Sequence, residues 1–172
     1  MTDNPADTPA YDRVLIISAR TPAISGFTLH FLFTLRQISD ILRKVTVYPV
    51  PFSPGHIKGV AVWREKVLPV LSLEAILGLK EVPLQGKDRF IVIKGGNGKW
   101  GIFKAGSEIR IMPLPSPCVP ANNIPRLHQS IMAKAIYEWP EGLLVIVDIE
   151  KILEGVTPLF SSADHPAQEF VI

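Results

Sequence analysis

Short runs of apolar and β-branched residues, separated by Gly, Pro and Asn, make up most of the chain. Such runs, bounded by turn-forming residues, are typical of β-strands. Many short strands at turn-spaced intervals favour barrels or a sandwich, and 16 prolines argue against a helical bundle. The pattern predicts strands at Arg13–Ala19, Thr28–Thr34, Ile57–Trp63, Lys66–Leu71, Arg89–Lys94, Trp100–Lys104, Glu108–Met112, Met132–Tyr137 and Leu143–Val147.

Two segments outside the predicted strands have local patterns that predict their structure. Gly95-Gly96-Asn97-Gly98 predicts a tight hairpin, because Asn-Gly and Gly-Gly supply the positive φ angles that such a turn requires. In Gln37–Lys44, the apolar residues Ile38, Ile41 and Leu42 stand one helical turn apart, so we expect a helical turn there. The polar or mixed ends, residues 1–10 and 161–172, predict flexible tails.

An internal repeat is the most informative feature of the pattern. Val62–Leu77 and Glu138–Leu153 align without gaps, and each predicts a turn, a buried strand, a helix cap and a short helix. Ser72 and Asp148 share the cap position, and the glutamate two residues later meets the positive end of the helix dipole. We therefore expect two related halves, each closing around its own core. The identical pairs are Trp63/Trp139, Glu65/Glu141, Leu68/Leu144, Glu74/Glu150, Ile76/Ile152 and Leu77/Leu153.

Composition limits the class of protein. A chain of 172 residues with 47% hydrophobic residues can bury one core or two small ones. It contains no apolar run long enough to span a bilayer, and its N-terminus is acidic and polar, unlike a signal peptide. We therefore predict a cytoplasmic protein without membrane insertion. Cys118 is the sole cysteine, so no internal disulfide forms, and we interpret it as a small hydrophobic residue.

The charge pattern and the motifs of the sequence do not indicate a catalytic, metal or nucleic-acid site. The net charge is +2, and Lys and Arg are too scattered for a nucleic-acid patch. The glycine-rich hairpin lacks the spacing of a phosphate-binding loop. No acid, base and nucleophile converge, so we expect no catalysis and no cofactor. The four histidines lack metal-ligand spacing, which predicts no metal site: His30, His56, His128 and His165.

The stretch Pro49–Leu79 resembles the CheW-like domain. In that family a Val-Pro and a further Pro lead into a Lys-Gly-Val strand, an Asn-Leu-Arg-Gly hairpin, a Val-Pro-Val strand and a helix start. The matching residues are Val50-Pro51, Pro54, Ile57-Lys58-Gly59-Val60, Arg64 and Val67-Leu68-Pro69-Val70. Ile38–Leu42 is similar to the upstream Val-x-Glu-Ile segment, with Asp40 at the acidic position. The likeness extends over roughly Val14–Leu153.

The resemblance implies a fold and a function. It implies a mainly β fold of two side-by-side, five-stranded, SH3-like β-barrels with short helices, within one domain at residues 11–160 made of two intertwined subdomains. It further implies a non-catalytic adaptor that couples a CheA-type histidine kinase, through the kinase's regulatory domain, to the cytoplasmic tip of a chemoreceptor. Self-association in arrays stays open, and we expect no nucleic-acid partner.

The resemblance implies partner contacts at five residues: Asp40, Lys58, Val62, Arg64 and Glu65. Arg64 is either a binding hot spot at a hairpin tip or a solvated charge beside Glu65. Asp40 either contacts a partner or solvates a helix end, whereas Lys58-Gly59 serves architecture first. We expect Trp63 in a core, because Trp139 repeats it.

The chain also departs from the family pattern. Of Asn-Leu-Arg-Gly only the arginine is present, since the chain has Val62-Trp63-Arg64-Glu65, and Ser72 replaces the capping aspartate. Two alternatives therefore stay open. One is a divergent scaffold of a type IV pilus or gliding system with a different partner. The other is a small barrel for single-stranded nucleic acid, suggested by Trp100 near Lys94, Lys99 and Lys104.

Overall fold

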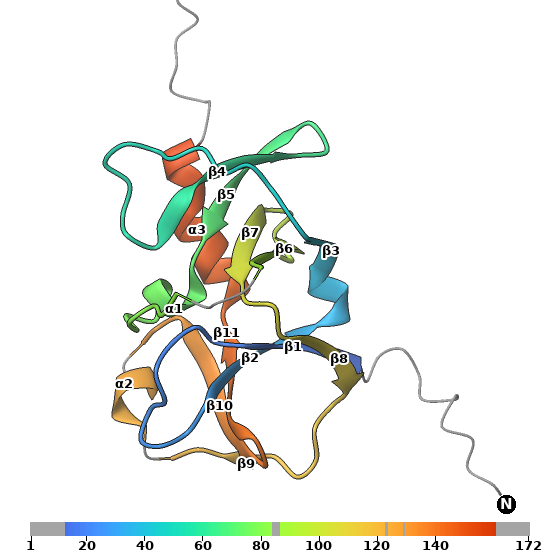
Figure 1. Ribbon diagram of the computed structural model, residues 1–172, viewed down its shortest axis with the longest axis vertical. Helices are drawn as coiled ribbons and strands as arrows, with labels where there is room; N and C mark the ends of the chain where they lie inside the picture. Colours follow the sequence, from blue (N-terminus) through green and yellow to red (C-terminus); the bar gives the residue numbers. More distant parts are fainter. Residues whose placement is uncertain (1–12, 84–86, 123, 129, 161–172) are drawn as a thin grey trace, which may run out of the picture.

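Two β-sheets form the body of the protein in the computed structural model, which describes residues 13–83, 87–122, 124–128 and 130–160 (Figure 1). The first sheet contains β1 (Arg13–Ser18), β2 (Leu29–Thr34), β8 (Ile109–Pro113), β9 (Val119–Pro120), β10 (Ala133–Trp139) and β11 (Gly142–Val147). The second contains β3 (Ile38–Leu42), β4 (Ile57–Trp63), β5 (Lys66–Leu71), β6 (Arg89–Lys94) and β7 (Trp100–Ala105). The helices are η3 (Leu35–Gln37), α1 (Leu73–Ile76), α2 (Pro125–His128) and α3 (Ile149–Phe160). The mainly β fold is as predicted, whereas the predicted tails, residues 1–10 and 161–172, lie outside the described residues.

Both sheets have the same topology. The first sheet has the order β8-β1-β2-β11-β10, extended by β9, and the second has the order β3-β6-β7-β5-β4. In each sheet the central pair, β2 with β11 or β7 with β5, is parallel. The other neighbours in these two five-strand orders are antiparallel. Strands β1 to β5 thus correspond in chain order to β6, β7, β8, β10 and β11, so the repeat extends over two whole halves.

The halves are interlocked. The first sheet joins β1 and β2 of one half to β8, β10 and β11 of the other, and the second sheet makes the reciprocal exchange. Two of the helices also contact the sheet that does not contain the strand preceding them. Although α1 follows β5 of the second sheet, the Glu74 carboxylate accepts a 2.7 Å hydrogen bond from the Arg20 amide, just after β1. Likewise α3 follows β11, but Glu150 accepts a 3.0 Å bond from the Gly96 amide, after β6.

The hydrophobic core has three parts. The largest cluster takes side chains from both sheets and from α1 and α3, including Phe31, Phe103 and Ile152. Smaller clusters contain Trp63 in the second sheet and Trp139 in the first. Both tryptophans are buried, which confirms the predicted core positions. The expectation that each half closes around its own core is incomplete, because the main core is shared.

The helical turn predicted at Gln37–Lys44 is wrong. The 3₁₀ helix η3 ends at Gln37, and β3 follows, pairing with β6. A bulge at Ser39 shifts the register, so that Ile38 pairs with Ile93 and Ile41 pairs with Ile91. The extra residue places Ile38 and Ile41 on the same face although they are three residues apart, which imitates helical spacing.

The predicted barrels are two sheets whose described backbone ladders do not close. In the second sheet, β3 and β4 are opposite edges. The Trp63 indole N–H of β4 donates to Asp40 of β3 at 3.1 Å, and Tyr48, in the segment after β3, forms two backbone hydrogen bonds with Val60 of β4. The sheet therefore curls like a barrel without a continuous backbone ladder.

The two predicted helix caps are confirmed. The Ser72 hydroxyl accepts from the Ala75 amide at 3.2 Å, and the Asp148 carboxylate accepts from the Lys151 amide at 3.1 Å. Each oxygen satisfies an amide of the first helical turn that has no partner within the helix. Among the described residues, no helix is long and apolar enough to cross a membrane.

Candidate partner-binding site

Asp40 holds the hairpin between β4 and β5 against the opposite edge of its sheet. One carboxylate oxygen, Oδ2, accepts from the Trp63 indole and lies 3.6 Å from the Arg64 guanidinium. The guanidinium carbon also lies 4.6 Å from the centre of the Trp63 ring, within the range of a cation–π contact. The arginine is therefore held in place while 69% of its side chain stays exposed.

The hairpin turn has an unusual backbone. Arg64 and Glu65 both have positive φ angles, 46° and 64°, which is the conformation of a two-residue turn that normally favours Asn and Gly. Among the described residues, the carboxylate at ion-pair distance from Arg64 is Asp40 and not the neighbouring Glu65. Glu65 is exposed at the tip.

An apolar pair extends the tip along the hairpin. Val62 and Val67 lie directly opposite each other, and their exposed fractions are 58% and 64%. Because opposite residues of an antiparallel pair share a face, the two side chains form one exposed apolar spot. Phe52, which the sequence analysis did not select, is fully exposed in the preceding loop with a φ of 58°.

Lys58 belongs to a different cluster. Its ammonium lies 2.6 Å from Glu81, which also lies 3.6 Å from the Arg20 guanidinium. Burial, the largest single influence, would raise the pKa of Glu81. The hydrogen bonds with Lys58 and Ser72 and the charges of Lys58 and Arg20 together outweigh it, so the pKa lies below its ordinary value. The structure therefore brings together Asp40, Val62, Arg64 and Glu65, whereas the Lys58 ammonium serves an internal ion pair.

The buried pair of Arg20 and Glu74 was not predicted from the sequence. The guanidinium lies 3.4 Å from the carboxylate, and both side chains are almost fully buried. The sequence pattern predicts an interaction of Glu74 with the helix dipole, but this carboxylate also binds the loop after β1, and so connects the first sheet to α1. The repeat of Glu74 at Glu150 was the available signal for a shared structural role.

The first sheet has an arginine–carboxylate pair that corresponds to Arg64 and Asp40, but its arginine is on the strand and its carboxylate is in the turn. Arg110 of β8 donates to Glu141 in the β10–β11 turn, and its guanidinium carbon lies 5.4 Å from the Trp139 ring centre. The hydrogen bond with Glu141 raises the pKa of Arg110, and the same bond lowers that of Glu141. Burial, and then the positive charge of Arg110, lower the pKa of His30, which packs edge-on against Trp139.

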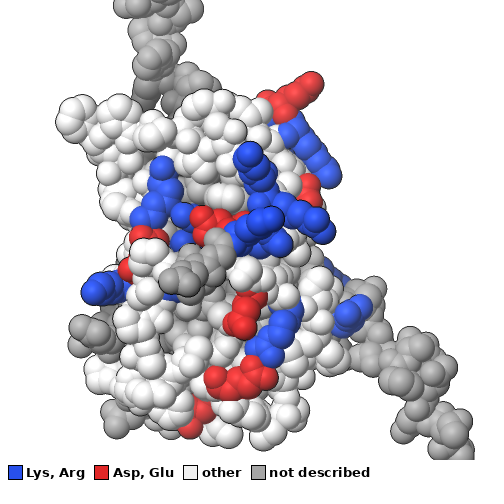
Figure 2. Space-filling model, viewed as in Figure 1, with Lys and Arg blue, Asp and Glu red and all other residues white. Residues whose placement is uncertain are grey.

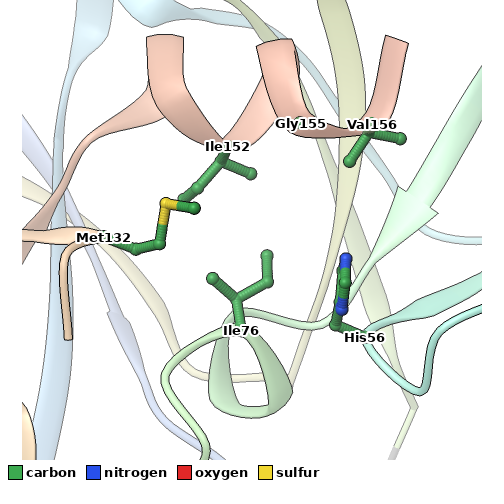
Figure 3. Close-up of a pocket in the computed structure, with 6 residues that line it drawn as sticks. All are labelled: His56, Ile76, Met132, Ile152, Gly155 and Val156. Carbon is green, nitrogen blue, oxygen red and sulfur yellow. The ribbon is translucent and has the colours of Figure 1, made fainter. Parts of the chain in front are cut away.

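A small apolar pocket lies between α1 and α3 (Figure 3). Its volume is about 190 Å³, and its side chains come from α1, α3, and the segments before β4 and β10. The lining residues are His56, Ile76, Met132, Ile152, Gly155 and Val156. Burial, followed by the charge of Lys58, lowers the pKa of His56, the one titratable group of this lining. The pocket fits an apolar side chain.

Other candidate chemistry gains no support in the described part of the chain. No group of three or more His, Cys, Asp or Glu residues there is placed to hold a metal ion. Trp100, the basis of the nucleic-acid alternative, packs 5.3 Å from Trp63, and the ammonium groups of Lys66 and Lys94 lie 4.4 and 5.3 Å from its ring centre. A ring with these contacts is not a free platform for stacking bases.

Comparison with known proteins adds two findings to this geometry. The family model described as the CheW-like domain matches residues 27–157. The chain is also similar in fold to the scaffolding protein TtCheW from Thermoanaerobacter tengcongensis, with a TM-score of 0.63 and 13% sequence identity, over 86% of this chain and 91% of that chain. No curated protein matches the chain.

Proposed function

Because the chain belongs to the CheW-like domain family, we propose that it is a non-catalytic cytoplasmic adaptor that couples a CheA-type histidine kinase to a chemoreceptor. The kinase contributes its regulatory domain, and the receptor contributes its cytoplasmic tip. Signalling then requires one partner to bind differently in the two states of the kinase, since only a difference in affinity shifts an equilibrium.

The exposed, rigidly held tip of the β4–β5 hairpin carries this proposal. Val62 and Val67 present apolar surface on one face, and Arg64 is fixed beside them by Asp40. Protein interfaces favour this combination of an apolar centre with an arginine whose position is set before binding. Lys58 contributes indirectly, because its ion pair with Glu81 anchors the strand that carries Val62.

The test is a calorimetric titration with the regulatory domain of a CheA-type kinase from the same genome. We expect a micromolar dissociation constant, and about tenfold weaker binding for Val62→Asp, because the variant buries an unpaired charge. Val119→Asp is the matched control, since Val119 has the same 58% exposure but lies on β9 of the other sheet.

Three results would contradict the proposal. Wild-type protein that binds no such kinase domain would remove the adaptor role. Equal weakening by Val62→Asp and Val119→Asp would remove the β4–β5 hairpin from the contact. Full binding by Val62→Asp would do the same.

A further inference from the structure

We propose that a groove centred on Lys44 binds an acidic segment of a partner protein, with an apolar side chain of that segment seated beside Tyr48. Two neighbouring hollows form the groove, and Lys44 lines both of them. The groove shares Val62 with the hairpin tip but none of the tip's charged residues. The inference does not depend on the coupling of a kinase to a receptor.

The first hollow is strongly cationic. Its volume is about 560 Å³, and its lining includes four basic side chains, those of Arg43, Lys44, Lys87 and Arg89. The single acidic residue of the lining, Asp88, is paired with Lys104 at 3.0 Å. Within the described part of the chain, none of the four basic side chains forms an ion pair. Figure 2 shows that Lys and Arg side chains gather near the middle of the face viewed there.

The second hollow combines polar and apolar surface. It has a volume of about 440 Å³, and Val45, Thr46, Tyr48 and Val62 line it together with Lys44. Tyr48 is 56% exposed, and its backbone is fixed by two hydrogen bonds with Val60, of 2.8 and 2.9 Å. An apolar side chain in this hollow would therefore meet a surface that is already ordered, which lowers the entropic cost of binding.

The equivalent place in the first sheet shows that the fold does not require all of these cations. Leu42 pairs with Phe90 in the second sheet as Met112 pairs with Val14 in the first. The residues that follow Met112 are Pro113 and Leu114, where the second sheet has Arg43 and Lys44, whereas Arg13 stands where the second sheet has Arg89. The cations at Arg43 and Lys44 are thus a property of the second sheet alone.

The ligand class follows from charge and from the neighbouring second hollow. Four unpaired like charges around one hollow repel each other, and carboxylates would both neutralise them and form charge-assisted hydrogen bonds. A nucleic-acid strand would need a row of exposed aromatic rings along its path, but the described lining of both hollows exposes a single ring, that of Tyr48. An acidic protein segment with an adjacent apolar residue satisfies both hollows.

The test is fluorescence anisotropy of the full chain with a labelled synthetic peptide of four glutamates followed by Leu-Phe. We expect Lys44→Glu to weaken binding by about tenfold, and raised salt to weaken it for the wild type. The matched control is Lys134→Glu, which reverses an exposed charge on β10 of the other sheet and should leave the affinity unchanged. Circular dichroism of each variant confirms that it is folded.

A second comparison tests the second hollow. Tyr48→Ala should weaken binding of the Leu-Phe peptide severalfold, while a peptide with Ser-Ser in place of Leu-Phe should bind both proteins equally. Equal weakening by Lys44→Glu and Lys134→Glu would overturn the assignment, as would equal affinity for a peptide with glutamine in place of glutamate. Equally tight binding of a single-stranded oligonucleotide of the same charge would overturn the choice of a protein segment.

Discussion

Two arginine–carboxylate pairs occupy equivalent places in the two halves but with their charges exchanged. Asp40 on β3 faces Arg64 in a turn, whereas Arg110 on β8 faces Glu141 in a turn. In both halves the arginine also lies over a buried tryptophan. Both halves have this pair, but the positive charge lies in the turn of one half and on the strand of the other. The two hairpin tips therefore carry different charges.

Replacement of Asp40 by alanine should lower the free energy of unfolding by about 1 kcal/mol, because the Trp63 indole loses its acceptor and Arg64 loses a partly exposed ion pair. Urea denaturation measures the change. Glu65→Ala serves as the control at the same tip and should change stability by less than about 0.5 kcal/mol. Equal effects of the two substitutions would show that the contacts of Asp40 with Trp63 and Arg64 do not stabilise the fold.

The buried His30 should make stability depend on pH. Burial and Arg110 lower its pKa from the ordinary 6.5, so the folded protein favours the neutral ring. The stabilising contribution is complete above pH 6.5 and is lost as the pH falls below that value. Denaturation curves at about pH 7.5 and about pH 5.5 should show this loss for the wild type.

His30→Gln should reduce the loss, because glutamine does not titrate. A smaller slope should remain, since the pKa of His56 is also lowered and acts in the same sense. Stability that rises on acidification, or a slope unchanged by His30→Gln, would contradict this account of the His30 environment.

At the scale of elements, alternation and turn residues were sufficient to predict nine of the strands, the Gly95–Gly98 turn and both helix caps, but not the short strand β9. They failed at β3, where Ile38 and Ile41 fit either a helix or a bulged strand. Pairing with β6 decides between the two, and β6 lies about fifty residues further along the chain. The partners of Asp40 and Glu74 were equally hidden, because the local pattern does not reveal which loops meet.

Glycine at position 65 should stabilise the β4–β5 hairpin. Arg64 and Glu65 both adopt positive φ angles, which cost an ordinary residue about 1 kcal/mol or more. Glu65→Gly removes that strain at one position, so we expect the free energy of unfolding to rise by about 0.5–1 kcal/mol. Lys66→Gly, in the adjoining strand, should instead destabilise the protein. A loss of stability in Glu65→Gly would contradict the assigned turn.

Gly59→Ala tests the packing of β4 against the preceding loop. A Cβ at this position would lie 2.2 Å from the Tyr48 carbonyl oxygen, and the φ angle is 145°. We expect destabilisation by about 2 kcal/mol or more. Gly155→Ala is the control, because a Cβ there meets nothing within 4 Å and alanine favours the helix. Thermal unfolding that ranks the two variants in the opposite order would contradict the described approach of strand and loop.

At the scale of the whole molecule, the repeat between Val62–Leu77 and Glu138–Leu153 predicted two related halves but not their interlocking. The exchange of strands depends on pairings between distant segments, such as β2 with β11, and no local pattern specifies them. The shared core and the helices that contact the opposite sheet join the two sheets into one unit. The two sheets are thus held in a fixed relation to each other, which is consistent with the proposed role as an adaptor between two proteins.

The most direct test of the adaptor role is sedimentation of a CheA-type kinase with vesicles that carry its chemoreceptor, with and without this protein. We predict that the protein sharply increases the amount of kinase that sediments, and that Val62→Asp lowers this amount while Val119→Asp does not. Kinase that sediments to the same extent without the protein, or that stays in solution when the protein is present, would contradict coupling as its function.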